Sequence, residues 1–573
     1  MKQLFLKYLR PHVPRMSVGL VIKFIGTIMD LLLPWILSYL IDDVVPQGRL
    51  PLILWWGGAM VLCAVAALVT NIVANRMASR VAQLTTQAVR HDLFAKISEL
   101  SCRQVDGFGI PSLESRLTTD TYNIHQMTGM MQRLGVRAPI LLLGGILITL
   151  HLEPVLSMVL IAVLPLLGGI IFYISRRGIP LYAHLQAGID TMVRTVRENA
   201  AGIRVIKALS KTEYECGRFS AVNREVVRRE KKAGMTMALT NPVMNLMLNA
   251  GLTAVILAGA WRVNAGLTQP GKILAFLTYF TIILNALLSI NRMFMMFSKG
   301  SASAARITAV LETPADLLVQ SAPASRKEVP YITFDHVSFS YQKKEDNVTD
   351  LSFSIQKGET LGIIGATGSG KSTVINLLMR LYDPDSGEIW LDGQRVDTIP
   401  PETLHQKFGV VFQGDILFGD TIAANIDFGR GLSRAQIQAA ADCAQAGAFI
   451  NNLPDGLDHR LTAKGTNLSG GQKQRVLIAR ALAGNPEILI LDDSSSALDY
   501  RTDARLRSAL REAYQNTTTI VIAQRISSVM QANRILVLDE GRMVGYGTHE
   551  ELMQTCALYR EIGKSQIGGE EVG

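Results

Sequence analysis

One short stretch of the chain combines residue types that suit the binding of a phosphate chain. The stretch begins with a short apolar run at residues 359–364, which is followed by Gly365 and Gly370, five positions apart. Lys371 and Ser372 come directly after Gly370, at the start of the next apolar run. Glycines let backbone N–H groups close around phosphate oxygens, and the start of the following helix attracts the same anion. In this pattern the lysine reaches the outer phosphates and the hydroxyl binds Mg²⁺. A glycine-rich turn without a ligand is the weaker alternative. The predicted phosphate-binding residues are Gly365, Thr367, Gly368, Ser369, Gly370, Lys371, Ser372 and Thr373.

Two further stretches fit the same chemistry. The run EILILDD predicts a buried strand that brings Asp492 to its carboxyl end, where a carboxylate can hold Mg²⁺ directly or through water. The run LSGGQ precedes a predicted helix, and its turn of Ser469, Gly470 and Gly471 before Gln472 is a second device for binding phosphate. Because one nucleotide does not need two such devices, the second could serve a nucleotide held by another copy of the domain. A simple N-capped helix is the alternative.

Composition divides the chain into a membrane half and a soluble half. Hydrophobic residues make up 48% of the 573 residues, and the long apolar runs lie before Ala305. The net charge is +9, but the basic residues gather beside the apolar runs, as the positive-inside rule expects for cytosolic loops. This placement argues against a soluble ATPase that acts on nucleic acid. The five cysteines have no metal-ligand spacing and are expected to stay reduced.

Six apolar segments approach the length of about 20 residues that a membrane helix needs. Connections after the second and fourth segments are long, charged and helical in pattern, so we expect them to extend into the cytosol, with short cross-helices within residues 111–124 and 202–215. The predicted spans cover residues 17–41, 52–73, 136–150, 155–174, 243–261 and 273–290.

The expected fold is therefore an all-α membrane domain followed by a soluble α/β nucleotide-binding domain. We expect the membrane domain, with six spans and two cytosolic coupling loops, to cover residues 1–311 and a linker with several prolines to cover 312–330. Residues 331–573 contain short strands that alternate with helices, which favours a mainly parallel sheet with its ligand at the strand ends.

Four motifs follow one another along the chain: the phosphate loop at 365–373, LSGGQ at 468–472, LILDD at 489–493 and SALD at 496–499. In this order they resemble the motifs of an ATP-binding cassette (ABC) exporter half-transporter. The resemblance covers essentially the whole chain and implies a multi-pass protein of the cell membrane with its cassette in the cytosol. It implies that Tyr341 stacks on adenine, that Gln413 lies near Mg²⁺ and the coupling helices, and that Asp499 closes the D-loop. It also implies that two cassettes enclose two ATP molecules head to tail, each between one phosphate loop and the other chain's LSGGQ.

Two residues depart from the family pattern. Asp493 stands where the family usually has the glutamate that positions the attacking water, and Gln524 replaces the family's switch histidine. Both would act on the ATP held by this chain's own phosphate loop, whereas LSGGQ is intact. We therefore expect a degenerate site that hydrolyses ATP slowly, in a chain that pairs with a different half-transporter as in heterodimeric bacterial multidrug exporters. A homodimer with slow hydrolysis is the alternative.

The sequence says less about the transported substrate. Fusion of the membrane part before the cassette is typical of export rather than import. Drugs or other amphipathic compounds are the expected substrates, and a lipid or peptide exporter of the same architecture is the alternative. Asp30 lies near the middle of the first predicted span, where an ionisable residue is a candidate for function. It could attract cationic compounds, or it could hydrogen-bond to a neighbouring helix.

Overall fold

The computed structural model describes residues 2–321, 330–341, 343, 346–494 and 497–567. It divides into two compact units. One unit comprises Met1–Ser98 and Pro111–Thr313, and the other comprises Glu99–Ile110 and Pro314–Gly573. The second unit thus contains the soluble domain together with a short piece of the first long connection. Residues 322–329 of the expected linker lie outside the described residues.

The first unit is built from helices, and six of its helical segments are long and apolar enough to cross a membrane. This confirms the predicted spans. The third span, which looks short in the sequence, lies within a continuous helix because its polar flanks are helical too. The helices are α1 (Lys2–Leu9), α2 (Val13–Tyr39), α3 (Leu50–Glu99), α5 (Ile110–Ser115), α6 (Thr121–Leu152), α7 (Pro154–Ala201), α8 (Ile203–Ala208), α9 (Thr212–Ala238), α10 (Thr240–Asn264) and α11 (Pro270–Leu311).

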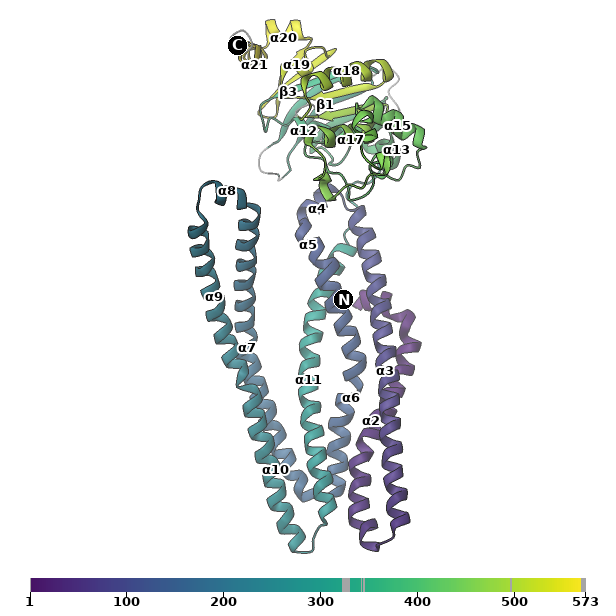
Figure 1. The fold of residues 1–573 in the computed structure, drawn as a ribbon, viewed down its shortest axis with the longest axis vertical. Coiled ribbons are helices and arrows are strands. Elements are labelled where there is room, and N and C mark those ends of the chain that lie inside the picture. Colours follow the sequence, from purple (N-terminus) through teal and green to yellow (C-terminus); the bar gives the residue numbers. More distant parts are fainter. Residues whose placement is uncertain (1, 322–329, 342, 344–345, 495–496, 568–573) are drawn as a thin grey trace. The chain divides into compact units, whose positions relative to one another are not determined.

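Helices α6 and α11 pack along each other, and α7 pairs with α9 through the short helix α8 at one end (Figure 1). The second cross-helix expected from the sequence is α8. Aromatic side chains of α11 fill the centre of the bundle, where Phe276, Tyr279 and Phe280 are fully buried together with Leu156 and Leu160 of α7. This apolar core packs the spans against each other.

The second unit is an α/β domain with a mainly parallel sheet, as predicted, but it also has a separate antiparallel sheet that the sequence analysis did not predict. One sheet is antiparallel in the order β2-β1-β4-β5, and the other has the order β10-β9-β3-β8-β7-β6 with only β10 antiparallel. The strands are β1 (Ile332–Phe339), β2 (Val348–Ile355), β3 (Thr360–Gly365), β4 (Ser386–Leu391), β5 (Gln394–Arg395), β6 (Phe408–Val411), β7 (Ile488–Asp492), β8 (Thr518–Ile522), β9 (Arg534–Asp539) and β10 (Arg542–Gly547).

Strand β8 lies between β3 and β7 in the parallel sheet, so the carboxyl ends of these three strands meet at one edge. The register pairs Ile522 of β8 with Ile363 of β3 and with Asp492 of β7. Every residue of β7 is buried, as expected for a central parallel strand. The order of the strands therefore gathers at one edge the loops that follow β3, β7 and β8.

Helices cover this sheet, and loops join them to its strands (Figure 1). The helices of the second unit are α4 (Cys102–Phe108), α12 (Lys371–Leu378), α13 (Pro401–Gln406), α14 (Ile422–Asp427), α15 (Arg434–Cys443), α16 (Gly447–Asn451), α17 (Gly470–Leu482), α18 (Tyr500–Ala513), α19 (Ile526–Val529), α20 (His549–Thr555) and α21 (Ala557–Ile567).

Candidate nucleotide-binding site

The loop between β3 and α12 has the backbone geometry of an anion cradle. Gly370 has φ +95°, a conformation that side chains with a Cβ rarely adopt, and it immediately precedes α12. A Cβ at Gly365 would lie 2.1 Å from the Leu538 carbonyl oxygen, so only glycine fits against β9. Both glycines are therefore required by the shape of the loop, which leads directly into the N-terminus of α12, the end of a helix that attracts anions.

Lys371 is buried, and its Nζ donates to the carbonyl oxygens of Gly365 (2.9 Å) and Ala366 (2.7 Å). Burial lowers the pKa of Lys371, although the nearby Asp492 and Asp493 oppose that shift. An anion bound in the loop would stabilise the charged lysine, because an opposite charge favours the charged form.

A cavity of about 220 Å³ lies beside this loop, and its lining residues are of the types that bind a phosphate chain. The Ser369 hydroxyl is buried in the loop, and no hydrogen-bond partner for its Oγ is found among the described residues. Two of the predicted phosphate-binding residues, Gly365 and Ser369, do not line the cavity, so a contact of Ser369 with phosphate remains a prediction. Thr367, Gly368, Gly370, Lys371, Ser372 and Thr373 all line the cavity, together with Asn347, which the sequence analysis missed because it lies outside every motif.

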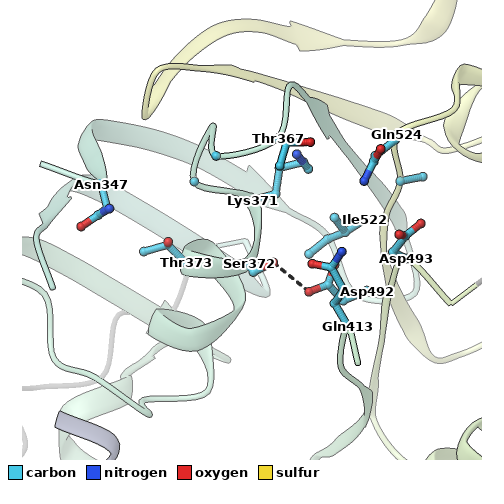
Figure 2. Close-up of a pocket in the computed structure, with 13 residues that line it drawn as sticks. Asn347, Thr367, Lys371, Ser372, Thr373, Gln413, Asp492, Asp493, Ile522 and Gln524 are labelled. Atoms are coloured by element: carbon cyan, nitrogen blue, oxygen red, sulfur yellow. Dashed lines mark hydrogen bonds between the residues drawn. The ribbon is translucent and has the colours of Figure 1, made fainter. Parts of the chain in front are cut away.

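The residues predicted to hold Mg²⁺ come together at one side of the cavity (Figure 2). The Ser372 hydroxyl donates to Asp492 Oδ2 at 2.8 Å, and the Gln413 backbone donates to the same carboxyl group. Burial raises the pKa of Asp492, against the effect of these hydrogen bonds. Hydroxyl, amide and carboxylate oxygens are the ligand types that Mg²⁺ takes alongside phosphate oxygens. The described residues therefore fit the expected ion, and bound Mg²⁺ would neutralise charge on the phosphates.

Asp493 and Gln524 line the same cavity at the end away from Asn347 (Figure 2). Asp493 follows β7 with φ 49°, a left-handed conformation that aspartate adopts more readily than most residues, and its N–H donates to the Ile522 carbonyl at 3.0 Å. Gln524 follows β8 and is exposed. Both residues that depart from the family pattern therefore border the pocket formed by this chain's own phosphate loop.

Comparison with known proteins decides the family. A family model described as ABC transporter transmembrane region matches residues 16–287, and one described as ABC transporter matches residues 348–496. The chain is 35% identical over 567 residues to the uncharacterized ABC transporter ATP-binding protein YfiB of Bacillus subtilis, with 99% of this chain and 98% of the relative covered. This chain is an ABC transporter. It is also 34% identical over 581 residues to the uncharacterized ABC transporter ATP-binding protein Rv1273c of Mycobacterium tuberculosis, covering 99% and 98%.

A solved structure narrows the architecture to that of an exporter. The structure of a bacterial Atm1-family ABC exporter with ATP bound superposes with a TM-score of 0.81 at 28% identity, covering 97% of this chain and 98% of that chain. Together with the six spans, this identifies an ABC exporter half-transporter that works as a dimer and couples ATP hydrolysis to transport. The protein is a multi-pass protein of the plasma membrane with a cytosolic nucleotide-binding domain that binds ATP.

The LSGGQ residues of this ABC transporter lie outside its own nucleotide cavity. Ser469 caps α17: its Oγ accepts from the Gln472 N–H at 3.3 Å, and Gln472 Oε1 accepts from the Ser469 N–H at 3.0 Å. Ser469 and Gly470 are exposed, and neither they nor Gly471 and Gln472 line the cavity around Lys371. The capped, exposed helix start is therefore available to a ligand that this chain's phosphate loop does not hold.

Two residues that the resemblance assigns to nucleotide contact also lie away from the cavity wall. Tyr341 is half-buried against the rings of Phe339 and Tyr382, and its hydroxyl accepts from Asn376 at 2.9 Å. Asp499 caps α18 by accepting from the Thr502 N–H at 2.9 Å. Ser496, the first residue of SALD, lies outside the described residues. Stacking of Tyr341 on adenine and closure by Asp499 remain predictions.

The prediction of a short cross-helix within residues 111–124 was wrong. Residues from Pro111 onward continue as α5 because proline is tolerated in a first helical turn. Helix α4 lies before them, capped by Ser101 with Gln104 and ended by Gly109 at φ 77°. Hydrogen bonds join this segment to the nucleotide-binding domain: Tyr382 donates to Asp106 at 2.7 Å, Ser101 to Asp316 at 2.8 Å, and Gln104 to the Pro314 carbonyl at 2.7 Å.

Asp30 lies on α2 and accepts a hydrogen bond from Arg137 of α6 at 3.2 Å. The Asp30 side chain is 23% exposed and that of Arg137 is 40% exposed. Two turns before Asp30 on α2, buried Lys23 donates to Asn71 and Asn75 of α3 at 2.8 and 3.0 Å. The Asp30 carboxylate is therefore bonded to a neighbouring helix, which is the packing arrangement that the sequence left open.

Proposed function

We propose that this chain is the ATP-retaining half of a heterodimeric exporter that moves amphipathic compounds out of the cell. The observation that carries the proposal is that Asp493 and Gln524 border the same cavity as Lys371, Ser372 and Asp492. Both departures from the family pattern therefore bear on one nucleotide. This chain's LSGGQ would complete the competent site on the partner's phosphate loop.

The chemistry of the two side chains explains slow hydrolysis. A general base must lie about 2.6–3.2 Å from the proton it takes, or reach it through a water, and aspartate is one methylene shorter than glutamate. Glutamine can hydrogen-bond a phosphate oxygen, but it cannot carry positive charge or relay a proton. Asp493 and Gln524 would thus hold ATP while activating its attacking water poorly. Ser372, Gln413 and Asp492 would hold Mg²⁺.

The transport cycle follows from two nucleotides shared by two chains. ATP in both sites would hold the cassettes together, because each nucleotide contacts both chains, and α4 and α8 would transmit this closure to the spans. Hydrolysis at the partner's competent site would then separate the cassettes on one side. The hydrogen bonds of α4 to Asp316 and Tyr382 support this role for the first coupling element.

Steady-state ATPase measurements test the division of labour. The purified lone chain should have weak activity, and co-expression with a six-span cassette protein that has Glu and His at the matching positions should restore it. Asp493→Glu combined with Gln524→His should raise hydrolysis by the lone chain. Brisk ATPase of the lone chain that Asp493→Asn abolishes would instead support the homodimer.

A matched pair of variants assigns each site to its chain. Ser469→Ala removes the cap of α17 without touching the cavity around Lys371, so it should reduce the activity of the pair while leaving ATP binding to the lone chain unchanged. Asp493→Asn changes the cavity around Lys371 and leaves the cap of α17 in place, so it should leave most of the activity of the pair intact. Equal losses in both variants would contradict the assignment.

For the substrate, we propose compounds with an apolar body and a charged group. Charged side chains of the membrane unit support this class, since Asp30 with Arg137 and Lys23 with its asparagine partners lie within or beside the spans. Asp30→Asn would leave Arg137 unpaired and should lower export of cationic dyes relative to neutral ones. Equal export of both would reject a role for Asp30 in selection. Dye-accumulation assays compared with lipid-flipping assays in liposomes distinguish drug export from lipid export.

A further inference from the structure

The loop between β8 and α19, which carries Gln524, is connected to helix α21 by the side chain of Gln566. Gln566 Nε2 donates to the Gln524 carbonyl oxygen at 2.8 Å, and Gln566 Oε1 accepts from the Ile526 N–H at 2.8 Å. A single amide therefore bridges the backbone on both sides of Arg525. This contact joins residues that are 40 and 42 positions apart in the chain.

The bridge satisfies a helix terminus that has no local cap. Helix α19 begins at Ile526, and its N-cap residue Arg525 makes no side-chain capping bond. The first N–H groups of a helix lack intrahelical acceptors, and a side-chain oxygen commonly supplies one. Gln566 supplies it here from another helix. The same amide holds the carbonyl of Gln524, so the conformation of the cavity-lining residue depends on the position of α21.

Packing keeps α21 in place for this contact. Tyr559 of α21 is fully buried in a cluster with Ile526 and Val529 of α19 and with Ile364, the residue that precedes Gly365 of the phosphate loop. A Cβ at Gly563 would lie 3.4 Å from Ile526 Cδ1, so α21 approaches α19 closely at that point. The helix thus has an apolar anchor of its own, and Gln566 adds the polar contact to the loop.

We propose that Gln566 is a positioning residue that aligns Gln524 with the terminal phosphate of ATP, so that α21 controls how long this site retains ATP. The inference rests on the proposed contact of Gln524 with that phosphate. Loss of the bridge would free the Gln524 backbone without removing any residue that lines the cavity. ATP should then leave faster, whereas ADP, which lacks the terminal phosphate, should leave at an unchanged rate.

The test measures release of a fluorescent, non-hydrolysable ATP analogue and of fluorescent ADP from the full-length chain in lipid nanodiscs. Gln566→Ala should release the ATP analogue about three- to tenfold faster, the effect of losing one or two neutral hydrogen bonds. Gln566→Glu keeps the acceptor for Ile526 but cannot donate to Gln524, so it should match Gln566→Ala. Ser565→Ala, at the exposed neighbouring position, is the control and should release both nucleotides as the wild type does.

A double-mutant cycle separates positioning from general loosening. If Gln566 acts through Gln524, Gln566→Ala should cause no further acceleration in a Gln524→Ala background. Unchanged release of the ATP analogue, equal acceleration for ADP, or independent effects in the cycle would each overturn the proposal. Because the analogue is not hydrolysed, these outcomes do not depend on the hydrolysis rate, and the proposed division of labour fails separately if the lone chain proves a brisk ATPase.

Discussion

Tyr382→Phe should loosen the first coupling element without altering nucleotide binding. The Tyr382 hydroxyl donates to Asp106 of α4 at 2.7 Å, and its ring packs on Phe339 and Tyr341, contacts that phenylalanine keeps. Burial, with a further contribution from Asp106, raises the pKa of Tyr382, so the hydroxyl stays a donor at neutral pH. Tyr382 does not line the nucleotide cavity. The substitution thus removes one hydrogen bond of the joint and little else.

The expected loss of docking free energy for α4 follows from the surroundings of this hydrogen bond. A hydrogen bond to a charged group contributes about 1.5–3 kcal/mol to stability. Because Asp106 is exposed, water replaces part of the lost hydrogen bond in the variant, and the docked state of α4 should lose about 1–1.5 kcal/mol. That free energy corresponds to a roughly five- to tenfold larger undocked population of α4. The bonds of Ser101 and Gln104 remain, so the helix stays docked most of the time.

Hydrogen exchange measures this population directly. Helix α4 has 7 residues and would not persist once undocked, because short isolated helices are unstable in water. Its amides should therefore exchange about five- to tenfold faster in Tyr382→Phe, in proportion to the undocked fraction. Tyr546→Phe removes a tyrosine hydrogen bond to the Ser354 carbonyl elsewhere in the domain and is the matched control. Identical exchange of α4 in both variants would refute the assignment of this joint.

Three further predictions concern the cavity and the membrane unit. Gly365→Ala should abolish thermal stabilisation by ATP, because its Cβ would lie 2.1 Å from the Leu538 carbonyl oxygen. Burial raises the pKa of Asp492 above its value in the unfolded chain. The nucleotide-free wild type should therefore gain stability as pH falls through that raised pKa and lose this stability as pH rises again. Thermal melts of Asp492→Asn should show no such pH dependence. Arg262→Met should cost about 3–5 kcal/mol in denaturant unfolding because it leaves buried Glu153 unpaired, and Glu153→Gln in the same chain should recover most of the loss.

The spans and the phosphate loop could be predicted because their signals are local. Each span is a contiguous apolar run, and the residues from Gly365 to Thr373 follow one another in the sequence, from the end of β3 to the first turn of α12. The meeting of Lys371, Asp492 and Gln524 in one cavity depends instead on β8 lying between β3 and β7, and strand order is not written in any single segment. The family resemblance assigned Asp493 and Gln524 to the ATP of this chain's own phosphate loop, but it did not supply the strand order.

Sequence analysis did not find the contact of Tyr382 with Asp106, and for Asp30 it offered a neighbouring helix but could not name Arg137, because these contacts join residues far apart in the chain. Tyr382 and Asp106 are separated by 276 positions, and Arg137 and Asp30 by 107, so neither pair leaves a periodic or spacing signal. The position of α4 did have a local signal that was overlooked. Ser101 and Gln104 form a capping box, which marks a helix start ahead of Pro111.

The central claim is that this chain's own pocket retains ATP while its partner hydrolyses it. Photo-crosslinkable ATP labelled on the α-phosphate, bound to the purified pair and chased with unlabelled ATP during turnover, tests this directly. The label should remain on this chain as uncleaved triphosphate over many turnovers of the pair, and should leave the partner as diphosphate within one. Equal loss of label from both chains, as diphosphate and at the turnover rate, would contradict the claim.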